Sequence, residues 1–250
     1  MSPLPLGVVE LGQRSYRPVL QLQRDLVQAR IAGILDRDLL LLVEHPPVVT
    51  FGRGTRSTSV PLPTKVLEAR GYQVADVERG GDVTVHAPGQ LVGYPILDLT
   101  PHRPDLHWYL RSLEEALIMT LDGLGLGAGR RDGLTGVWVG DRKIASIGVH
   151  VKRWVTLHGF ALNVTTDLAL FDVVVPCGIP GVVMTSVARE LGGRAQGPGS
   201  PEPSAALWSH TVTGLVAAFG TVFSRHPEAL SPDSLPVNPA IVTAANPMGG

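Results

Sequence analysis

The chain has one cysteine, few charged residues and little excess of either charge. Cys177 is the only cysteine among 250 residues, so no internal disulfide can form. Charged residues make up 17% of the chain and the formal net charge is −1. Non-specific binding to nucleic acid requires many cationic groups, because it neutralises many phosphates. We therefore expect no nucleic-acid partner.

Long apolar runs and targeting segments are also missing. No run of about 18 apolar residues is present, so we predict no membrane span and no membrane partner. The segment from Met1 to Glu10 lacks a basic stretch followed by an apolar one, which is the pattern of a secretory signal. Together with the lone cysteine, these absences predict a soluble, cytoplasmic protein in a reducing compartment.

Several common catalytic motifs are absent. No serine stands in a Gly-x-Ser-x-Gly elbow, and no glycine-rich loop ends in Lys-Ser or Lys-Thr. There is no His-Glu-x-x-His motif and no pair of cysteines, and the eight histidines are scattered. We therefore expect no metal site and no bound cofactor.

The residues that are present predict one domain of mixed architecture. Apolar residues form 44% of the chain, which is enough for a core of normal size. Apolar and periodic segments predict strands at 6–11, 39–43, 48–51, 72–78, 83–85, 91–97 and 155–164, helices at 16–33, 64–70, 105–124 and 204–223, and a hairpin of 136–139 with 143–151. Because these elements interleave without strict alternation, we predict an α/β (α+β) fold in which helices flank a mixed β-sheet.

This domain is expected to occupy residues 1–225. Gly192–Pro203 is dense in Gly, Pro and Ser, which predicts a flexible loop. Residues 226–250 contain several prolines and show little periodicity, so we predict a disordered tail.

Two glycines and two polar residues mark the segment Arg79-Gly-Gly-Asp-Val-Thr-Val-His86-Ala-Pro-Gly-Gln90. Gly80-Gly81 lets the backbone turn sharply and approach a ligand closely. Arg79 and His86 bracket a short strand. The segment is therefore a candidate pocket wall, and a plain hairpin is the alternative.

A lysine opens the apolar segment Lys143-Ile-Ala-Ser-Ile-Gly148, just after the turn Gly140-Asp141. Strand alternation would place Lys143, Ala145 and Ile147 on one face. A lysine drawn into an apolar wall can exchange its proton near neutral pH, which is a property of acid/base residues. A solvated lysine is the alternative.

The lone cysteine stands in the sequence Pro176-Cys177-Gly178, after an apolar run. This position predicts a tight turn at a strand end, where a thiol can be exposed to backbone N–H groups. A neighbouring cation would lower the pKa of the thiol and activate it as a nucleophile. An inert, buried cysteine is the alternative.

The segment His158-Gly-Phe-Ala-Leu-Asn163 alternates small and apolar residues behind a polar head. Such a pattern suits the wall of an apolar channel. A core strand would have a similar sequence.

Five segments together resemble the octanoyltransferases of lipoate biosynthesis. They are, in chain order, Leu42–Arg53, Arg79–Gln90 continued by Tyr94-Pro95, Gly136–Val139 with Lys143–Gly148, His158–Asn163, and Pro176–Gly178. The matching region covers about residues 6 to 223, and Lys143 and Cys177 have the separation found in that family. The resemblance implies the fold of the lipoate and biotin ligase catalytic domain.

The resemblance also implies roles for single residues. Cys177 matches the nucleophile that carries the acyl group as a thioester, and Lys143 matches its acid/base partner. The positions that match the walls of the acyl site are Arg79, Gly80, Gly81, Asp82, Val83, Thr84, Val85, His86, Ser146, Ile147, Gly148, Gly159, Phe160 and Ala161. One departure is Ala87, where the family usually has glycine, and its methyl group could narrow the pocket.

The implied reaction joins two protein partners. Octanoyl-acyl carrier protein would donate octanoyl to Cys177. A lysine of a lipoyl domain, in a 2-oxoacid dehydrogenase complex or in the glycine cleavage H protein, would accept it. This is the first step of endogenous protein lipoylation, carried out by a monomer. The main alternative is an ATP-dependent lipoate or biotin ligase, which shares the fold and does not require a cysteine. A non-catalytic acyl-binding module and a thioester hydrolase are further alternatives.

Overall fold

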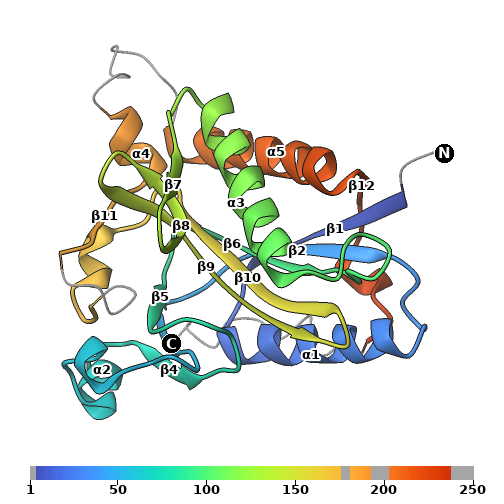
Figure 1. Ribbon diagram of the computed structural model, residues 1–250. Helices are drawn as coiled ribbons and strands as arrows, with labels where there is room; N and C mark the ends of the chain where they lie inside the picture. The colour runs from blue at the N-terminus through green and yellow to red at the C-terminus, as the bar shows by residue number, and fades with distance from the viewer. Residues whose placement is uncertain (1–3, 176–180, 193–202, 238–250) are drawn as a thin grey trace.

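The computed structural model describes residues 4–175, 181–192 and 203–237, and for residues 203 and 204 only the backbone. Its centre is a large mixed β-sheet with α1 on one face and α3 and α5 on the other (Figure 1). The sheet runs in the order β12 (Arg225–Ala229), β1 (Leu4–Gln13), β2 (Asp38–Glu44), β6 (Gln90–Ile96), β10 (Val155–Asn163), β9 (Arg142–Lys152), β8 (Leu134–Val139) and β7 (Gly129–Arg131). This confirms the predicted mixed sheet flanked by helices.

Both parallel and antiparallel pairing occur in this sheet. β1 is parallel to β12 and to β2, whereas β2, β6, β10, β9, β8 and β7 pair antiparallel. β11 (Val183–Met184) adds a short parallel pairing with β9. A second, small sheet contains β4 (Gln73–Asp76), β3 (Val48–Phe51) and β5 (Thr84–His86).

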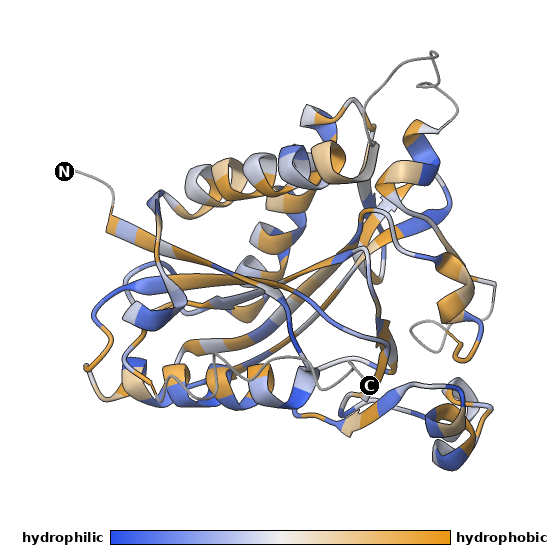
Figure 2. Cartoon of the chain, turned by 180° about the vertical axis from the view of Figure 1, so that it is seen from behind, coloured by the Kyte–Doolittle hydropathy of each residue, from blue (hydrophilic) through white to orange (hydrophobic). Residues whose placement is uncertain are grey.

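The helices follow the apolar periodicity of the sequence. They are α1 (Tyr16–Ile31), α2 (Thr64–Ala69), α3 (Leu106–Gly123), α4 (Val187–Leu191) and α5 (Pro203–Phe223), with short 3₁₀ turns at Ser57–Ser59, Leu168–Phe171 and Pro232–Ser234. The helix predicted over 105–124 begins at an N-cap, because the Asp105 side chain accepts a hydrogen bond from the Trp108 N–H at 3.0 Å. Figure 2 shows both apolar and polar residues along α1, as expected of a helix with one buried and one exposed face.

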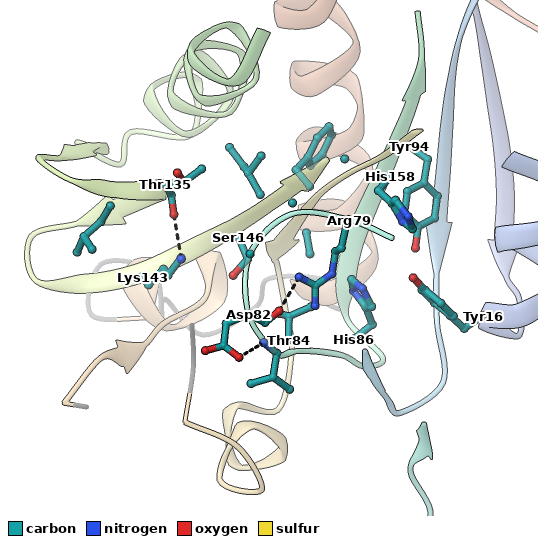
Figure 3. Close-up of a pocket in the computed structure, with 18 of the residues that line it drawn as sticks. Tyr16, Arg79, Asp82, Thr84, His86, Tyr94, Thr135, Lys143, Ser146 and His158 are labelled. Carbon is teal, nitrogen blue, oxygen red and sulfur yellow. Dashed lines mark hydrogen bonds between the residues drawn. The ribbon is translucent and has the colours of Figure 1, made fainter. Parts of the chain in front are cut away.

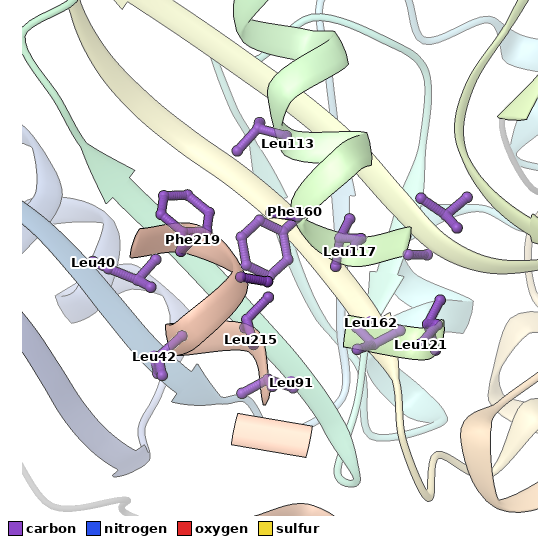
Figure 4. Close-up of a cluster of buried hydrophobic side chains, with 14 of the residues drawn as sticks. Leu40, Leu42, Leu91, Leu113, Leu117, Leu121, Phe160, Leu162, Leu215 and Phe219 are labelled. Atoms are coloured by element: carbon purple, nitrogen blue, oxygen red, sulfur yellow. The ribbon is translucent and has the colours of Figure 1, made fainter. Parts of the chain in front are cut away.

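The main core lies between the sheet and the pair α3 and α5 (Figure 4). Leu113, Leu117 and Leu121 recur every fourth residue on α3 and belong to the same buried cluster as Phe160 of β10. Phe219 of α5 packs beside Phe160, with ring centroids 6.2 Å apart. A second core fills the space between α1 and the opposite face of the sheet. The phenylalanine that lines the functional cavity described below is thus anchored in the main core.

The apolar composition of α5 has an explanation in this packing. Residues Ala205–Phe223 are long and apolar enough to cross a membrane by length and composition, which the sequence analysis did not predict. Leu215, Phe219 and Phe223 of this helix are fully buried in the core beside α3. One face of α5 is thus part of the core, and 39% of the apolar window is buried.

The C-terminal segment is more ordered than predicted. A disordered tail from residue 226 is wrong for residues 226–237, because β12 pairs with β1 and the Leu230 N–H donates to the Val8 carbonyl at 2.8 Å. β12 lies at the sheet edge, where its proline is tolerated. Local composition could not reveal this pairing, since the partner strand lies at the other end of the chain. Residues 238–250 lie outside the described residues.

The predicted loop Gly192–Pro203 lies mostly outside the described residues, which stop at Gly192 and resume at Pro203. Gly192 closes α4, and Pro203 begins α5. The sequence did not predict β7, β11 or α4, because segments of two to five residues are too short for a periodic signal.

Candidate active site

A cavity of about 220 Å³ opens between β9, β10 and the loop that precedes β5. Most residues of the predicted pocket walls line it, and Figure 3 shows side chains from three separate segments turned toward one another. The predicted positions that line the cavity are Arg79, Gly81, Asp82, Val83, Thr84, His86, Lys143, Ser146, Ile147, Gly148, Gly159, Phe160 and Ala161. Tyr16, Tyr94, Gly133, Leu134, Thr135 and His158 complete the lining.

Gly80 and Val85 belong to the same wall without facing the cavity. Val85 lies between Thr84 and His86 on β5, so strand alternation turns it away, into a third apolar cluster. The Gly80 N–H donates to the Val149 carbonyl at 2.9 Å and so ties the loop to β9. Ala87 is fully buried and is not among the residues of the lining, so its methyl group does not narrow the cavity.

Cys177 lies outside the described residues, which stop at Val175 and resume at Gly181. The described residues that follow Gly181 pair with the strand that carries Lys143. Met184 in β11 is the register partner of Lys143 in β9, and the Thr185 N–H donates to the Lys143 carbonyl at 2.9 Å.

Lys143 is buried in the cavity wall, with 3% of its surface exposed. Its Nζ donates to the Thr135 carbonyl at 3.0 Å and lies 5.4 Å from the centre of the Trp138 ring. A lysine this buried requires such partners, because an isolated charge away from water is unfavourable. The alternative of a solvated lysine is therefore wrong.

A β-bulge shapes the strand that carries Lys143. Trp138 of β8 pairs with Lys143, whereas Val137 pairs with Ala145, so β9 has one extra residue at this point. The extra residue breaks the alternation predicted for Lys143, Ala145 and Ile147. Ala145 is buried in the main core, while Lys143 and Ser146 face the cavity.

Gly136 leaves the space that the Lys143 side chain occupies. Its φ is +128°, and a Cβ at this position would lie 2.6 Å from the Ala145 carbonyl oxygen and 2.8 Å from Lys143 Cε. Contacts that short do not occur between real atoms of this kind, so only glycine fits here without movement.

Arg79 uses most of its hydrogen-bond donors on backbone and side-chain groups of the cavity wall. Its Nη1 donates to the carbonyl oxygens of Asp82 at 2.6 Å and Gly80 at 3.2 Å. Its Nη2 donates to the Thr50 carbonyl at 2.8 Å and to the Thr50 hydroxyl at 2.9 Å. The guanidinium therefore holds the Gly80-Gly81 loop against β3, and it lines the cavity while doing so.

An aromatic and imidazole cluster lies at the opposite end of the cavity from Lys143, where Figure 3 labels Tyr16, His86, Tyr94 and His158. His45 supports it from behind. Its Nδ1 donates to the Arg14 carbonyl at 2.6 Å, so its Nε2 accepts from the Tyr94 hydroxyl at 2.9 Å.

Burial keeps this cluster uncharged at neutral pH. It lowers the pKa of His45 to about 4 and that of His86 to about 3. It raises the pKa of Tyr16 to about 12 and that of Tyr94 well above its usual range. Tyr16, His86 and Tyr94 at this end of the cavity are therefore uncharged at neutral pH, and the Arg79 guanidinium lies near enough to act on all three.

The part of β10 that lines the cavity contains a residue with a strained backbone conformation. His158 has φ +59°, a left-handed conformation that costs on the order of 1 kcal/mol for a residue with a side chain. The buried Gln23 side chain of α1 accepts a hydrogen bond from the His158 N–H at 3.0 Å and holds this conformation. The next residue, Gly159, packs so closely on the Gly93 carbonyl that a Cβ would overlap it.

Sequence reasoning left Tyr16, His45 and Tyr94 without a role. His45 and Tyr94 stand inside segments that carry the family resemblance, so their presence there was the available signal. Tyr16 had none, because it begins a helix far from the other segments and only the fold brings it to them. Among the described residues, no group of three or more His, Cys, Asp or Glu side chains could hold a metal ion.

A family model and similar proteins of known name agree on the family of this chain. Residues 15–201 match the family described as lipoyl protein ligase A/B catalytic domain. An octanoyltransferase of Solibacter usitatus is 52% identical over 186 residues, which cover 74% of this chain and 83% of that protein. An octanoyltransferase of Gloeobacter violaceus is 50% identical over 172 residues, which cover 69% of this chain and 75% of that protein.

Solved structures of lower sequence identity share the fold. A lipoate-protein ligase A bound with ATP superposes with a TM-score of 0.66 at 18% identity, covering 92% of this chain and 89% of that one. A bipartite lipoate protein ligase of Thermoplasma acidophilum, studied with its E2 lipoyl domain, gives a TM-score of 0.64 at 18% identity, with 92% and 88% covered. The predicted fold of the ligase catalytic domain is thereby confirmed.

Proposed function

Because the chain belongs to the lipoyl protein ligase A/B catalytic domain family and is an octanoyltransferase within it, we propose that it transfers octanoyl from octanoyl-acyl carrier protein to a lysine of a lipoyl domain. Cys177 carries the octanoyl group between the two proteins as a thioester. Lys143 moves the protons.

The burial of Lys143 at one end of the cavity is the observation that carries this proposal. A lysine amine held away from water, within a cavity wall, is suited to take and return a proton beside a reacting group. Val83, Ile147 and Phe160 supply apolar surface in the same cavity, as an eight-carbon chain requires.

The first half-reaction loads the enzyme. Lys143 Nζ takes the proton of the Cys177 thiol, and the thiolate attacks the carbonyl carbon of the octanoyl thioester on the carrier protein. A new C–S bond forms, and the bond to the carrier sulfur breaks. The departing carrier thiolate receives the proton from Lys143, so the enzyme is left as an octanoyl thioester with its base restored.

The second half-reaction unloads it onto a new partner. The lysine amine of a lipoyl domain attacks the thioester carbonyl, an amide bond forms and the C–S bond to Cys177 breaks. One proton of the amine returns to the Cys177 sulfur through Lys143. A thioester lies above an amide in free energy, so no ATP is consumed. The acceptors are lipoyl domains of 2-oxoacid dehydrogenase complexes and the glycine cleavage H protein, and the enzyme is a cytoplasmic monomer without a cofactor.

An ATP-dependent ligase is the second candidate, and the fold shared with a lipoate-protein ligase A bound with ATP favours it. Such an enzyme activates a free acid and does not need a cysteine. At 18% identity that likeness concerns the fold alone, whereas the relatives of about 50% identity are octanoyltransferases.

Intact-mass measurement tests the proposal. Wild-type protein incubated with octanoyl-acyl carrier protein should gain one octanoyl group that hydroxylamine removes, and should pass it to a lipoyl domain. Cys177→Ser should give no hydroxylamine-sensitive adduct, and Lys143→Met should slow loading at least a hundredfold. Wild-type transfer rates in Cys177→Ser, or modification of the lipoyl domain only with free octanoate and ATP, would refute it.

A further inference from the structure

We propose that Glu114 is a positioning residue for Lys143 and acts through the single peptide group that joins Thr135 to Gly136. The inference rests on the proposed function, since it concerns how the acid/base lysine is held. Glu114 lies on α3, outside the cavity lining.

Glu114 is a buried carboxylate with 1% of its surface exposed. Its Oε2 accepts from Arg111 Nη1 at 2.7 Å and from Arg130 Nε at 3.0 Å, which balances its charge. Its Oε1 accepts from the Gly136 N–H at 3.1 Å. A buried carboxylate needs hydrogen bonds beyond its ion pairs to satisfy its remaining lone pairs, and here the third bond goes to the backbone of a cavity strand.

Lys143 is bound on the other side of the same peptide group. The N–H of Gly136 and the C=O of Thr135 belong to one amide plane, and the C=O accepts the hydrogen bond from Lys143 Nζ at 3.0 Å (Figure 3). A carboxylate that accepts a hydrogen bond from the N–H polarises the amide group and so increases the partial negative charge on its carbonyl oxygen. Hydrogen bonds linked in this way strengthen one another. Glu114 therefore holds the carbonyl in place and makes it a stronger acceptor for the lysine.

The strand pairing is irregular on both sides of this peptide group. At Gly136 the φ of +128° departs from that of a regular strand, and the pairing of β8 with β9 begins only at Val137. The pairing of β8 with β7 shifts register between Leu134 and Trp138, the stretch that contains the Thr135–Gly136 peptide. α3 lies beside β8 (Figure 1) and supplies a further constraint through Glu114.

Single-turnover loading of Cys177 from octanoyl-acyl carrier protein measures the effect. Glu114→Ala should lower the loading rate by about 10- to 100-fold, with the half-saturating concentration of carrier protein changed less than twofold, because Glu114 is buried and lies outside the cavity lining. Glu114→Gln should lower the rate only several-fold, since its amide oxygen can still accept from the Gly136 N–H although the charge is lost. Glu115→Ala is the matched control. Glu115 is a half-exposed neighbour that also pairs with Arg130, and its loss should leave the rate within twofold.

A double-mutant cycle with Lys143→Met separates a positioning role of Glu114 from general destabilisation. The cycle uses Glu114→Gln, so the test can still be made if Glu114→Ala does not fold. Glu114→Gln should lower the loading rate several-fold in the wild type and have no effect in Lys143→Met. Equal losses in both backgrounds, or a folded Glu114→Ala at the wild-type rate, would overturn the inference while the proposed function stands. A fully active Lys143→Met would instead overturn the proposed function, and the inference with it.

Discussion

At the scale of single residues, the cavity depends on positions where a side chain is absent as much as on those where one is present. Lys143 reaches the Thr135 carbonyl because Gly136 has no Cβ to block it. Arg79 shows the converse. Its position in the cavity suggests a ligand contact, yet its guanidinium is engaged by three backbone carbonyls of the wall.

Gly136→Ala should therefore impair octanoyl transfer at least a hundredfold while destabilising the protein by about 1–3 kcal/mol. The added methyl group would displace the Lys143 side chain, and the left-handed φ adds strain. Gly140→Ala is the matched control, because Gly140 also has a positive φ, of +55°, nothing lies within 4 Å of its Cβ, and it is outside the cavity lining.

Transfer assays and urea unfolding on both variants separate the two effects. Gly140→Ala should lose stability by a similar amount and retain most of its activity. Equal activity of the two variants would show that the space beside Lys143 is not required.

At the scale of elements, the C-terminal strand is held by one buried carboxylate. Asp38 opens β2, and its Oδ2 accepts from Arg225 Nε of β12 at 3.0 Å. Its Oδ1 accepts from Arg30 of α1 at 3.3 Å and from the Asp98 N–H at 3.0 Å. Burial alone would raise the pKa of Asp38, but the hydrogen bonds from His102 and the Asp98 N–H, with the two arginine charges, hold it below its usual range.

Asp38→Asn should lower the free energy of unfolding by about 3 kcal/mol, because it leaves Arg225 buried without its counter-charge. Asp36→Asn, at a position with an exposed side chain two residues earlier, should change it by less than 0.5 kcal/mol.

Urea unfolding of both variants gives the comparison, and limited proteolysis reports on β12 separately. Cleavage near residues 225–237 should become faster in Asp38→Asn only. Unchanged stability in that variant would mean that backbone pairing with β1 suffices to hold the strand.

At the scale of the whole molecule, buried neutral histidines tie stability to pH. His45 and His86 have pKa values of about 4 and about 3, because burial disfavours their charged forms. In the unfolded chain a histidine has a pKa of about 6.5. Between these values the unfolded state binds protons that the folded state does not, so stability is complete above pH 6.5 and falls as the pH decreases.

Urea unfolding at pH 7.0 and pH 5.0 should therefore show a loss of about 2 kcal/mol or more, since each such histidine contributes up to about 1.4 kcal/mol per pH unit. The lowered pKa of Glu78 and Asp38 adds a separate loss only at lower pH, where those carboxylates begin to bind protons.

His86→Gln should reduce the pH dependence, whereas replacement of the exposed His107 should leave it unchanged. A slope that is the same in wild type and His86→Gln would show that the buried imidazoles do not control it.

The sequence by itself determined the longer helices and strands, the mixed architecture and most of the cavity lining. These follow from local signals: apolar periodicity, the glycines of the Arg79–Gln90 segment, and a lysine opening an apolar strand. Only the tertiary structure showed the features that depend on long-range contacts. It brought Tyr16 to the cavity, paired β12 with β1, turned Ala145 away through a bulge, and set Glu114 behind the peptide that holds Lys143. Periodicity describes one element at a time, whereas a bulge, an edge pairing or a buried ion pair depends on partners far along the chain.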